Sequence, residues 1–270
     1  MMHRSRPLLG TYVEITADSA EIIAAGFSAV ERIHSLMSAH DPDSELGRLN
    51  RIGHREPVEV SPETVAVLER AVHWWRLSCG TFDVAAAGTR SLMDGRIPHH
   101  LGQPHPAAKD SSVLLVAGRT VRLTAPACLD LGGIAKGYAV DEAVRAMRRC
   151  GAVRGLVNAG GDLLGFGPEP WTISVVDSRT RRPLVEVSLR DEALATSACI
   201  DGSTAHLPRG TLWSSVTVRA PSACDADALT KIVWAGDGDA GDLLRRAGAR
   251  AFGIRVDGRV EEVGEPALAA

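Results

Sequence analysis

The stretch from Asp130 to Asp141, which reads DLGGIAKGYAVD, constrains the fold of this 270-residue chain more than any other. It places a carboxylate, a pair of glycines and a lysine directly before apolar residues at helical spacing, a pattern that continues to Met147 and ends at Gly151. The preceding segment, 120–129, alternates like a strand. We therefore expect a strand, a glycine-rich turn and a helix in immediate succession.

A glycine-rich turn before a helix is suited to holding a phosphate group. The first N–H groups of a helix have no partner within it and lie at the positive end of its dipole, so they attract anions. Glycine has no β-carbon, which lets a phosphate approach the main chain, and Lys136 adds a positive charge. The spacing matches neither a dinucleotide fingerprint nor a Walker loop. Because a glycine pair at a helix start also serves plain packing, the turn alone leaves both interpretations open.

Composition narrows the class of protein only broadly. A hydrophobic content of 45% in 270 residues suffices for a full core, as one large domain or two closely joined lobes. The net charge of −3, with mixed signs, gives no reason to expect a nucleic-acid partner. No apolar run approaches the roughly 20 residues of a membrane span, and the first nine residues lack the apolar core of a secretory signal. We therefore expect a cytoplasmic protein.

Apolar periodicity and turn residues predict a mixed chain of helices and strands. Strands are expected at 11–16, 155–157, 171–176, 184–189 and 214–219. Helices are expected from Ile23 to Met37, from Pro62 with Ser61 as its N-cap, and over 225–234. Hairpins are expected to turn at 118–119 and at 257–258. Segment 90–112, rich in histidine, proline and glycine, is expected to be a surface loop.

Five further motifs accompany the glycine-rich turn. They are, in chain order, Asp41–Leu46, Gly80–Asp83, Asn158–Asp162, Ala195–Ser197 and Ala226–Leu229. In this order and combination the motifs resemble those of the ApbE-like FAD:protein FMN transferases, over nearly the whole chain. The resemblance implies a single domain of residues 1–270 with an α+β fold, related to the T-fold. Two interleaved α/β lobes of that fold would hold the nucleotide in the cleft between them.

Enzymes of that family cleave FAD and attach its FMN half to a threonine or serine hydroxyl of a target protein. The resemblance therefore implies FAD as substrate, Mg²⁺ as cofactor, a flavin-acceptor protein as partner and AMP as product. Transfer of this type needs a cradle for the phosphates, positive charge against the negative charge that develops on their oxygens, and a base for the attacking hydroxyl.

The resemblance assigns the nucleotide to residues from most of these motifs. Asp130 and Lys136 are implied to contact FAD, and the backbone carbonyl of Gly133 is implied to bind the metal. Further contacts with the nucleotide are implied for Leu9, His40, Thr81, Phe82, Asp83, Asn158, Gly160, Gly161, Asp162, Thr196, Ser197 and Arg209. Asparagine and glycine tolerate a positive φ, so the run that begins at Asn158 also predicts a tight turn.

The metal and the base are the points at which this chain departs from the family's pattern. The family binds its metal through an aspartate and a threonine four residues later on one helix. Here Asp227 is present, Thr230 lies three residues later, and Lys231 takes the fourth position. Thr230 shares a helix face with Asp227 and is expected to help bind the metal, whereas the Lys231 ammonium could repel or replace it. Asp227 and His206 are the expected catalytic residues.

Three functions stay open at this point. The first is Mg²⁺-dependent transfer of FMN to a protein hydroxyl. The second is FAD binding without transfer, and the third is a metal-dependent FAD pyrophosphatase in which water replaces the hydroxyl. Asp227 favours the first and the third, whereas Lys231 and the short segment around His206 favour the second.

Overall fold

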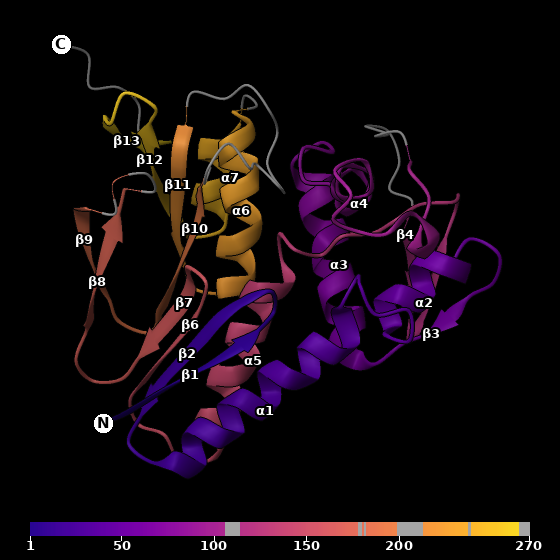
Figure 1. Ribbon diagram of the computed structural model, residues 1–270. Coiled ribbons are helices and arrows are strands. Elements are labelled where there is room, and N and C mark those ends of the chain that lie inside the picture. The colour runs from indigo at the N-terminus through magenta and orange to yellow at the C-terminus, as the bar shows by residue number, and fades with distance from the viewer. Residues whose placement is uncertain (106–113, 178–179, 181, 199–212, 237–238, 265–270) are drawn as a thin grey trace. The chain divides into compact units, whose positions relative to one another are not determined.

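The computed structural model describes residues 1–105, 114–177, 180, 182–198, 213–236 and 239–264, which form an α+β fold (Figure 1). The helices are α1 (Ala20–Met37), α2 (Glu45–Ile52), α3 (Pro62–Leu77), α4 (Val84–Met93), η1 (His99–Leu101), α5 (Ala135–Arg149), α6 (Ala223–Ala235) and α7 (Ala240–Arg246). The strands are β1 (Met2–Leu8), β2 (Thr11–Ala17), β3 (Val58–Glu59), β4 (Leu114–Ala117), β5 (Thr120–Leu123), β6 (Gly155–Ala159), β7 (Asp162–Phe166), β8 (Trp171–Val176), β9 (Pro183–Leu189), β10 (Glu192–Ala198), β11 (Trp213–Ala220), β12 (Arg250–Arg255) and β13 (Val260–Val263).

The chain divides into two compact units. The first unit comprises Met1–Val30 and Lys136–Ala270, and the second comprises Glu31–Ala135. The second unit is therefore inserted into the sequence of the first, which is the interleaved arrangement that the family resemblance implied. The nucleotide cleft expected between the two stays a prediction.

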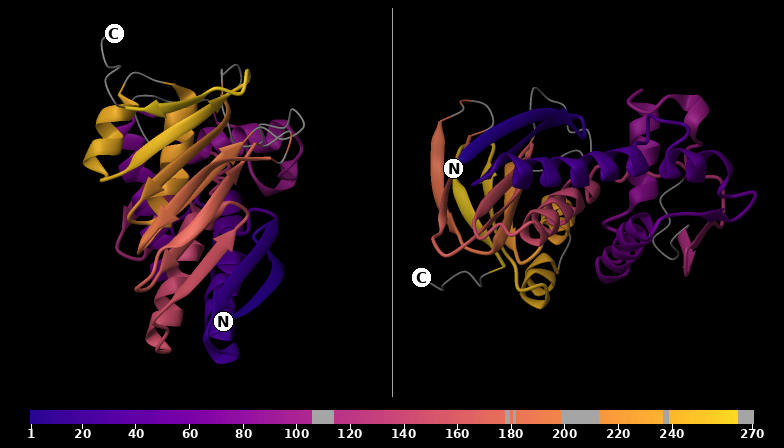
Figure 2. Two further views of the ribbon diagram at one scale, coloured as in Figure 1. Left: turned by 90° about the vertical axis from the view of Figure 1, so that its left-hand side faces the viewer. Right: turned by 90° about the horizontal axis from the view of Figure 1, so that it is seen from below.

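An eight-stranded antiparallel sheet forms the frame of the first unit, in the order β1-β2-β6-β7-β10-β11-β12-β13. Helices α5 and α6, with the first turns of α1, cover one of its faces (Figure 2). The chain alternates accordingly in β2, where Val13 and Ile15 are fully buried, Tyr12 is exposed, and Glu14 and Thr16 are half-buried. Gly26 of α1 gives close contact, because a β-carbon there would lie 2.8 Å from Ile15 Cδ1.

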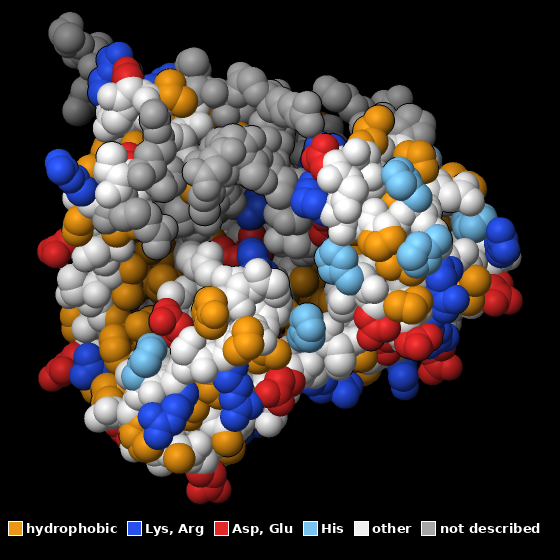
Figure 3. All heavy atoms as spheres, in the orientation of Figure 1, with side chains coloured by type: hydrophobic (Ala, Val, Ile, Leu, Met, Phe, Trp, Pro, Cys, Tyr) orange, Lys and Arg blue, Asp and Glu red, His pale blue; other side chains and the backbone are white. Residues whose placement is uncertain are grey.

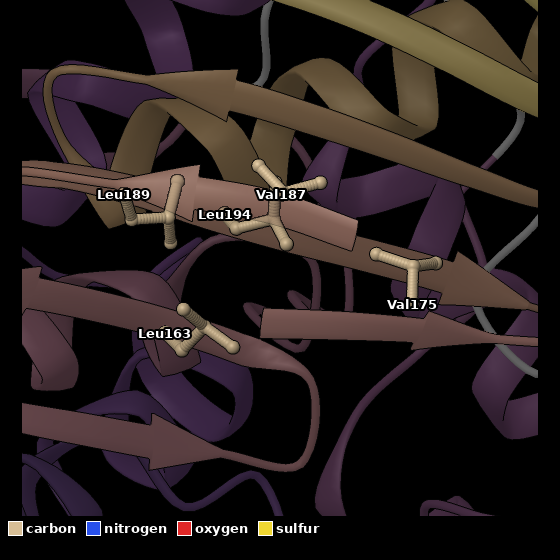
Figure 4. Packing of buried hydrophobic residues seen from close by; sticks show 5 residues of the cluster. All are labelled: Leu163, Val175, Val187, Leu189 and Leu194. Carbon is tan, nitrogen blue, oxygen red and sulfur yellow. The ribbon is translucent and has the colours of Figure 1, made fainter. Parts of the chain in front are cut away.

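The two-stranded ribbon β8–β9 covers the middle of the opposite face. Its side chains Val175, Val187 and Leu189 pack against Leu163 of β7 and Leu194 of β10 (Figure 4). Every residue of β7 is buried, although successive side chains of a strand point to opposite faces. The centre of the sheet is therefore covered on both sides, and β7 lies in the interior of a three-layer structure.

The second unit combines α2, α3 and α4 with a three-stranded sheet in the order β3-β5-β4. Glu45 at the start of α2 accepts hydrogen bonds from the backbone N–H of Ser61 (2.9 Å), the Ser61 hydroxyl (2.8 Å) and the Thr64 hydroxyl. Ser61 is also the N-cap of α3 and accepts from Thr64 N. One carboxylate thus links the beginnings of two helices.

Helices α5 and α6 of the first unit are joined at unusually close range. Asp141 of α5 accepts hydrogen bonds from the first N–H groups of α6, Ala223 N (2.9 Å) and Cys224 N (3.0 Å), and from the Ser222 hydroxyl. A β-carbon on Gly137, one turn earlier in α5, would lie 2.1 Å from the Ala223 carbonyl oxygen. Only glycine permits this approach, which sets the position of α6 relative to the beginning of α5.

Most elements expected from periodicity are confirmed, including the helix capped by Ser61, the helix from Ala135 and both predicted hairpins. The strand expected over 120–129 is wrong beyond Leu123, where β5 ends. Pro126 lies in this segment and has no N–H for a ladder. The glycine pair therefore follows an irregular segment rather than a strand.

Other elements lack an expectation in the sequence. Strands β1, β3, β7 and β10 and helices α2, α4, η1 and α7 were not predicted, and the last turn of α4 enters the expected loop 90–112. Within that loop Ile97 and Leu101 are buried, so its described part is not wholly a surface segment. None of the described helices combines the length and the apolar character needed to cross a membrane.

We predict that Asp141→Ala lowers the free energy of unfolding by about 2 kcal/mol, because it leaves two N–H groups at the start of α6 without their acceptor. Asp141→Asn keeps one acceptor oxygen and should lose less. Urea denaturation followed by circular dichroism measures both. Asp239→Ala is the matched control, since Asp239 occupies the N-cap of α7 and makes no capping hydrogen bond through its side chain. Equal losses in Asp141→Ala and Asp239→Ala would contradict the assignment.

Candidate functional site

Two lysines and two aspartates form a buried ion cluster in the first unit. Lys136 comes from α5, Asp162 from β7, and Asp227 and Lys231 from α6. The Lys136 ammonium donates to the Asp162 carboxylate and to Asp227 Oδ2 (3.3 Å). The Lys231 ammonium donates to Asp227 Oδ1. Asp227 therefore lies between two cations. Lys136, Asp162 and Asp227 each belong to a motif described above, and Lys231 follows shortly after the last of these motifs.

The close contact between α5 and α6 positions this cluster. Gly137 lies against the start of α6 and donates its backbone N–H to Asp227 Oδ2 (3.4 Å). Lys136 precedes Gly137 in the first turn of α5, and Asp227 lies one turn into α6. The ammonium and the carboxylate meet because the two helix starts are held together. A larger side chain at position 137 would separate them.

Burial and mutual charge shape the ionisation of the cluster. The side chains of Asp162 and Asp227 are 2% and 0% exposed, those of Lys231 and Lys136 12% and 24%. Burial acts to raise the pKa of Asp227, but the ammonium groups of Lys136 and Lys231 outweigh it, and the pKa lies below its ordinary value. Burial and the neighbouring charge of Asp227 raise the pKa of Asp162 to about 6.

The lysine beside these carboxylates stays charged. Burial acts to lower the pKa of Lys136, but the charges of Asp162 and Asp227 raise it above its ordinary value. Two ammonium groups and two carboxylates give the fully ionised cluster no net charge. The cluster can therefore be buried without an unbalanced charge.

Hydroxyl groups extend the cluster toward β10. Thr230 donates its hydroxyl to the Asp227 backbone carbonyl (2.7 Å), and its oxygen is within 2.7 Å of the Ser197 hydroxyl and accepts from Lys231 (3.0 Å). The structure therefore brings together Ser197, Thr230 and Asp227, which come from two different motifs. Lys231 joins the same group.

The Asn158–Asp162 motif forms the tight turn predicted for it, between β6 and β7. Gly160 and Gly161 have φ values of +64° and +99°, and Asn158 Oδ1 accepts from Gly161 N (3.0 Å). A β-carbon on Gly160 would lie 2.4 Å from Thr11 Oγ1. Leu9, half-buried in the turn between β1 and β2, has a positive φ of 56°. These two turns share one part of the first unit, because β2 pairs with β6.

Neighbouring strands hold the turn and its surroundings in register. Thr196 donates its backbone N–H to Gly161 O (3.1 Å), and its hydroxyl lies 3.0 Å from that of Thr217 on β11. Asn158 donates its side-chain amide to Glu14 on β2 (3.0 Å). Glu14 was not expected at the site, because nothing but strand pairing connects it with Asn158.

In the second unit, the predicted carboxylates have structural partners. Asp83 is the N-cap of α4 and accepts from Ala85 N (2.8 Å). Asp130 is buried and accepts from Gly132 N (2.8 Å) and from the hydroxyl of Ser91. Its own backbone N–H donates to Val84 O (3.0 Å). Asp83 and Asp130 are thus brought together by the start of α4, and the contact of Asp130 with FAD stays a prediction.

The other predicted residues of the second unit differ in burial. Phe82 is buried, Thr81 is half-buried and His40 is exposed. Arg90 was not expected at this place. Burial lowers the pKa of its guanidinium, and the negative charges of Asp83 and Asp130 oppose this effect. Its Nε is buried without a hydrogen-bond partner among the described residues. The role of the Gly133 carbonyl stays a prediction, as do the nucleotide contacts of Phe82, Thr81 and His40.

Two predicted residues, the base His206 and the phosphate contact Arg209, lie outside the described residues. Within the described ranges, no three histidine, cysteine, aspartate or glutamate side chains gather as a metal site would require. Among the described residues, Asp227, Thr230 and the backbone carbonyl of Gly133 are the predicted ligands of the metal.

The residues predicted to bind Mg²⁺ do not fit the ion in this arrangement. Mg²⁺ is bound by oxygen atoms with free lone pairs, in near-octahedral geometry. Asp227 already accepts from two ammonium groups, and Thr230 uses its proton and its oxygen within the cluster. A cation would have to displace Lys231 to reach either side chain.

The sequence and the fold of this chain are both similar to those of known proteins. Residues 9–253 match the sequence profile of the ApbE family. The FAD:protein FMN transferase of Treponema pallidum is 27% identical over 275 residues, covering 84% of this chain and 76% of that protein. The FAD:protein FMN transferase of Vibrio cholerae is 28% identical over 221 residues, covering 73% and 65%. The crystal structure of the ApbE protein from Thermotoga maritima is similar with a TM-score of 0.82 at 28% identity, covering 97% of this chain and 96% of that one.

We predict that Asp227→Asn lowers the free energy of unfolding by about 3 kcal/mol at pH 7, because it leaves a buried ammonium without its carboxylate. The pKa of Asp227 is lower in the folded protein than in the unfolded chain. Its carboxylate therefore stabilises the fold above pH about 4, and this contribution is lost as the pH falls through the lowered value. The difference between wild type and variant should shrink below pH about 4.

Urea denaturation at several pH values measures this difference. Asp242→Asn is the matched control, since Asp242 pairs with Arg246 at the same i,i+4 spacing but at a half-buried position of α7 where the arginine is exposed. We expect little change in that variant at any pH. A difference between wild type and Asp227→Asn that stays constant from pH 7 to pH 3 would rule out a stabilising charge on Asp227.

Proposed function

Because this chain belongs to the ApbE family, we propose that it transfers the FMN half of FAD to a serine or threonine hydroxyl of a second protein and releases AMP. The observation that carries the proposal is the Lys136 ammonium, held by Asp162 and Asp227 at the start of α5. The supporting relatives are FAD:protein FMN transferases that cover 84% and 73% of this chain.

Lys136 has the properties that a contact with phosphate requires. Its raised pKa keeps the side chain charged, and 24% of the side chain remains exposed, so the ammonium can reach a ligand without leaving its carboxylates. A cation fixed before the ligand arrives needs little rearrangement when negative charge develops on phosphate oxygens. Asp162 and Asp227 act on the reaction through Lys136, by setting its position.

The proposed transfer balances as a displacement at phosphorus. The acceptor hydroxyl oxygen forms a bond to the phosphorus that carries the riboflavin part of FAD, and the bond from this phosphorus to the AMP oxygen breaks. AMP leaves with the bonding electron pair, and the hydroxyl proton passes to a base. We propose His206 as that base. Asp227 and Thr230 are already hydrogen-bonded to Lys231, so the side chains predicted to bind Mg²⁺ do not fit the ion in this arrangement.

The proposed partner is a flavin-acceptor protein rather than a nucleic acid. Figure 3 shows Lys and Arg side chains interspersed with Asp and Glu over the described part of this face. Mixed signs give no extended basic surface there, which a nucleic acid would need for neutralising its phosphates. The cytoplasmic location expected from the sequence stays a prediction.

We predict that the full chain, incubated with FAD and a threonine-containing acceptor peptide, raises the mass of the peptide by that of FMN less one water and releases an equal amount of AMP. A copy of the peptide with valine in place of threonine should stay unlabelled. Mass spectrometry and chromatography of the nucleotides measure both products. AMP and free FMN without labelled peptide would indicate a pyrophosphatase instead, and FAD binding without turnover would indicate a binding protein.

Lys136→Met tests the observation that carries the proposal. We expect its rate of AMP release to fall by about 100-fold, because the fixed positive charge at the phosphates is lost. Arg145→Met is the matched control, since Arg145 is an exposed cation on the same helix, paired with Glu142. That variant should retain its rate. If Lys136→Met released AMP as fast as Arg145→Met, Lys136 would have no role in the reaction.

A further inference from the structure

Lys231 is the residue of the ion cluster that the proposed reaction does not use. We infer that its ammonium is a built-in cation, which takes the place of a protein-bound divalent metal ion at Asp227 and keeps such ions from this carboxylate. The inference rests on the proposed function and deepens it, because it says which group supplies the positive charge beside Asp227 that a metal ion would otherwise supply. Its test requires no turnover.

The carboxylate of Asp227 has little capacity left for another cation. Oδ1 accepts from the Lys231 ammonium, and Oδ2 accepts from the Lys136 ammonium (3.3 Å) and from Gly137 N (3.4 Å). Three donors therefore occupy two oxygens, each of which has two lone pairs. The side chain is fully buried, so water does not compete for these bonds. One lone pair, on Oδ1, is left for a metal ion, and an ion bound there would lie beside the positive charge of the Lys231 ammonium.

The hydroxyl of Thr230 is committed as well. Its proton is used in the bond to the Asp227 carbonyl, so its oxygen accepts from Ser197 and from Lys231. A hydroxyl has one proton and two lone pairs, and all three are then occupied. Lys231 thus bonds to the two side chains that were predicted as metal ligands. Its ammonium lies where an ion shared by Asp227 and Thr230 would be bound.

The balance of charge favours the ammonium over a divalent ion. With Lys136, Lys231, Asp162 and Asp227 ionised, the cluster is neutral. A divalent ion added to it would leave two uncompensated positive charges in a buried site, which is unfavourable because burial removes the water that would solvate them. An ion that replaced Lys231 would have to drive its ammonium out of a position that is only 12% exposed. Both routes oppose metal binding.

The spacing on α6 explains why a lysine can fill this role. Residues four apart on a helix lie on the same face, and an aspartate followed by a lysine at i+4 is the favourable orientation for an ion pair. The long apolar stem of lysine packs along the helix while the ammonium reaches the carboxylate. The positive charge is then part of the chain and does not depend on the concentration of a metal.

Binding of Mn²⁺ alone to the full chain tests the inference, because oxygen ligands accept Mn²⁺ and Mg²⁺ alike and the electron paramagnetic resonance signal of free Mn²⁺ decreases when the ion binds. We expect Lys231→Met to bind about one Mn²⁺ per chain at Asp227 and Thr230. The added change Asp227→Asn should remove this site. Wild type should have no Mn²⁺ site that depends on Asp227. Arg246→Met, which removes the i+4 partner of Asp242 and leaves its i+3 partner Arg245, should gain no site.

Two results would overturn the inference. One is a Mn²⁺ site in the wild type that Asp227→Asn abolishes, and the other is a folded Lys231→Met protein that gains no site. Should Lys231→Met fail to fold by circular dichroism, Lys231→Gln replaces it, and the wild-type comparison with Asp227→Asn is decisive by itself. The Mn²⁺ measurements use neither FAD nor an acceptor. Their results are therefore independent of whether the proposed transfer reaction takes place.

Discussion

The close approach of α5 and α6 is the constraint on which the ion cluster depends. Gly137 lets the main chains of the two helices touch, and Asp141 ties the first N–H groups of α6 to α5. Lys136 and Asp227 lie within one turn of these contacts, so their ion pair follows from the packing of the helices. The covered sheet supplies the second support, because Asp162 begins a strand that is buried on both faces.

Burying four charged groups is unfavourable, and here two positive and two negative charges compensate each other. Each ammonium lies against a carboxylate, and the remaining polar capacity is filled by backbone N–H groups and hydroxyls of neighbouring elements. Such an arrangement is sensitive to the loss of any one member, because the partner is then left charged in a medium of low dielectric constant. The same property fixes each ammonium in one place. A site that must meet phosphate oxygens benefits from charges that do not move.

Local patterns in the sequence predicted much of this fold and only part of the site. The cap at Ser61, the helix after the glycine pair and the Asn158 turn each depend on neighbouring residues, and all are confirmed. The closeness of Lys231 to Asp227 follows from helix spacing, whereas the pairing of Asp227 with Lys136 was not predictable in this way, since Lys136 lies 91 residues away along the chain. The strand before the glycine pair was predicted too long, because alternation continues past Leu123 while Pro126 cannot join a ladder. Local sequence patterns thus do not predict which distant elements pair with one another.

The position of the second unit within the sequence has a consequence for synthesis on the ribosome. Strand β2 pairs with β6, and the bond between Glu14 and Asn158 spans 144 residues. At roughly 5–20 residues per second, β6 is made on the order of ten seconds after β2. During that interval one edge of the nascent β1–β2 hairpin lacks its partner strand, and an unpaired edge invites association with other chains. Chaperone binding to the β1–β2 hairpin would protect this edge while the inserted unit is translated.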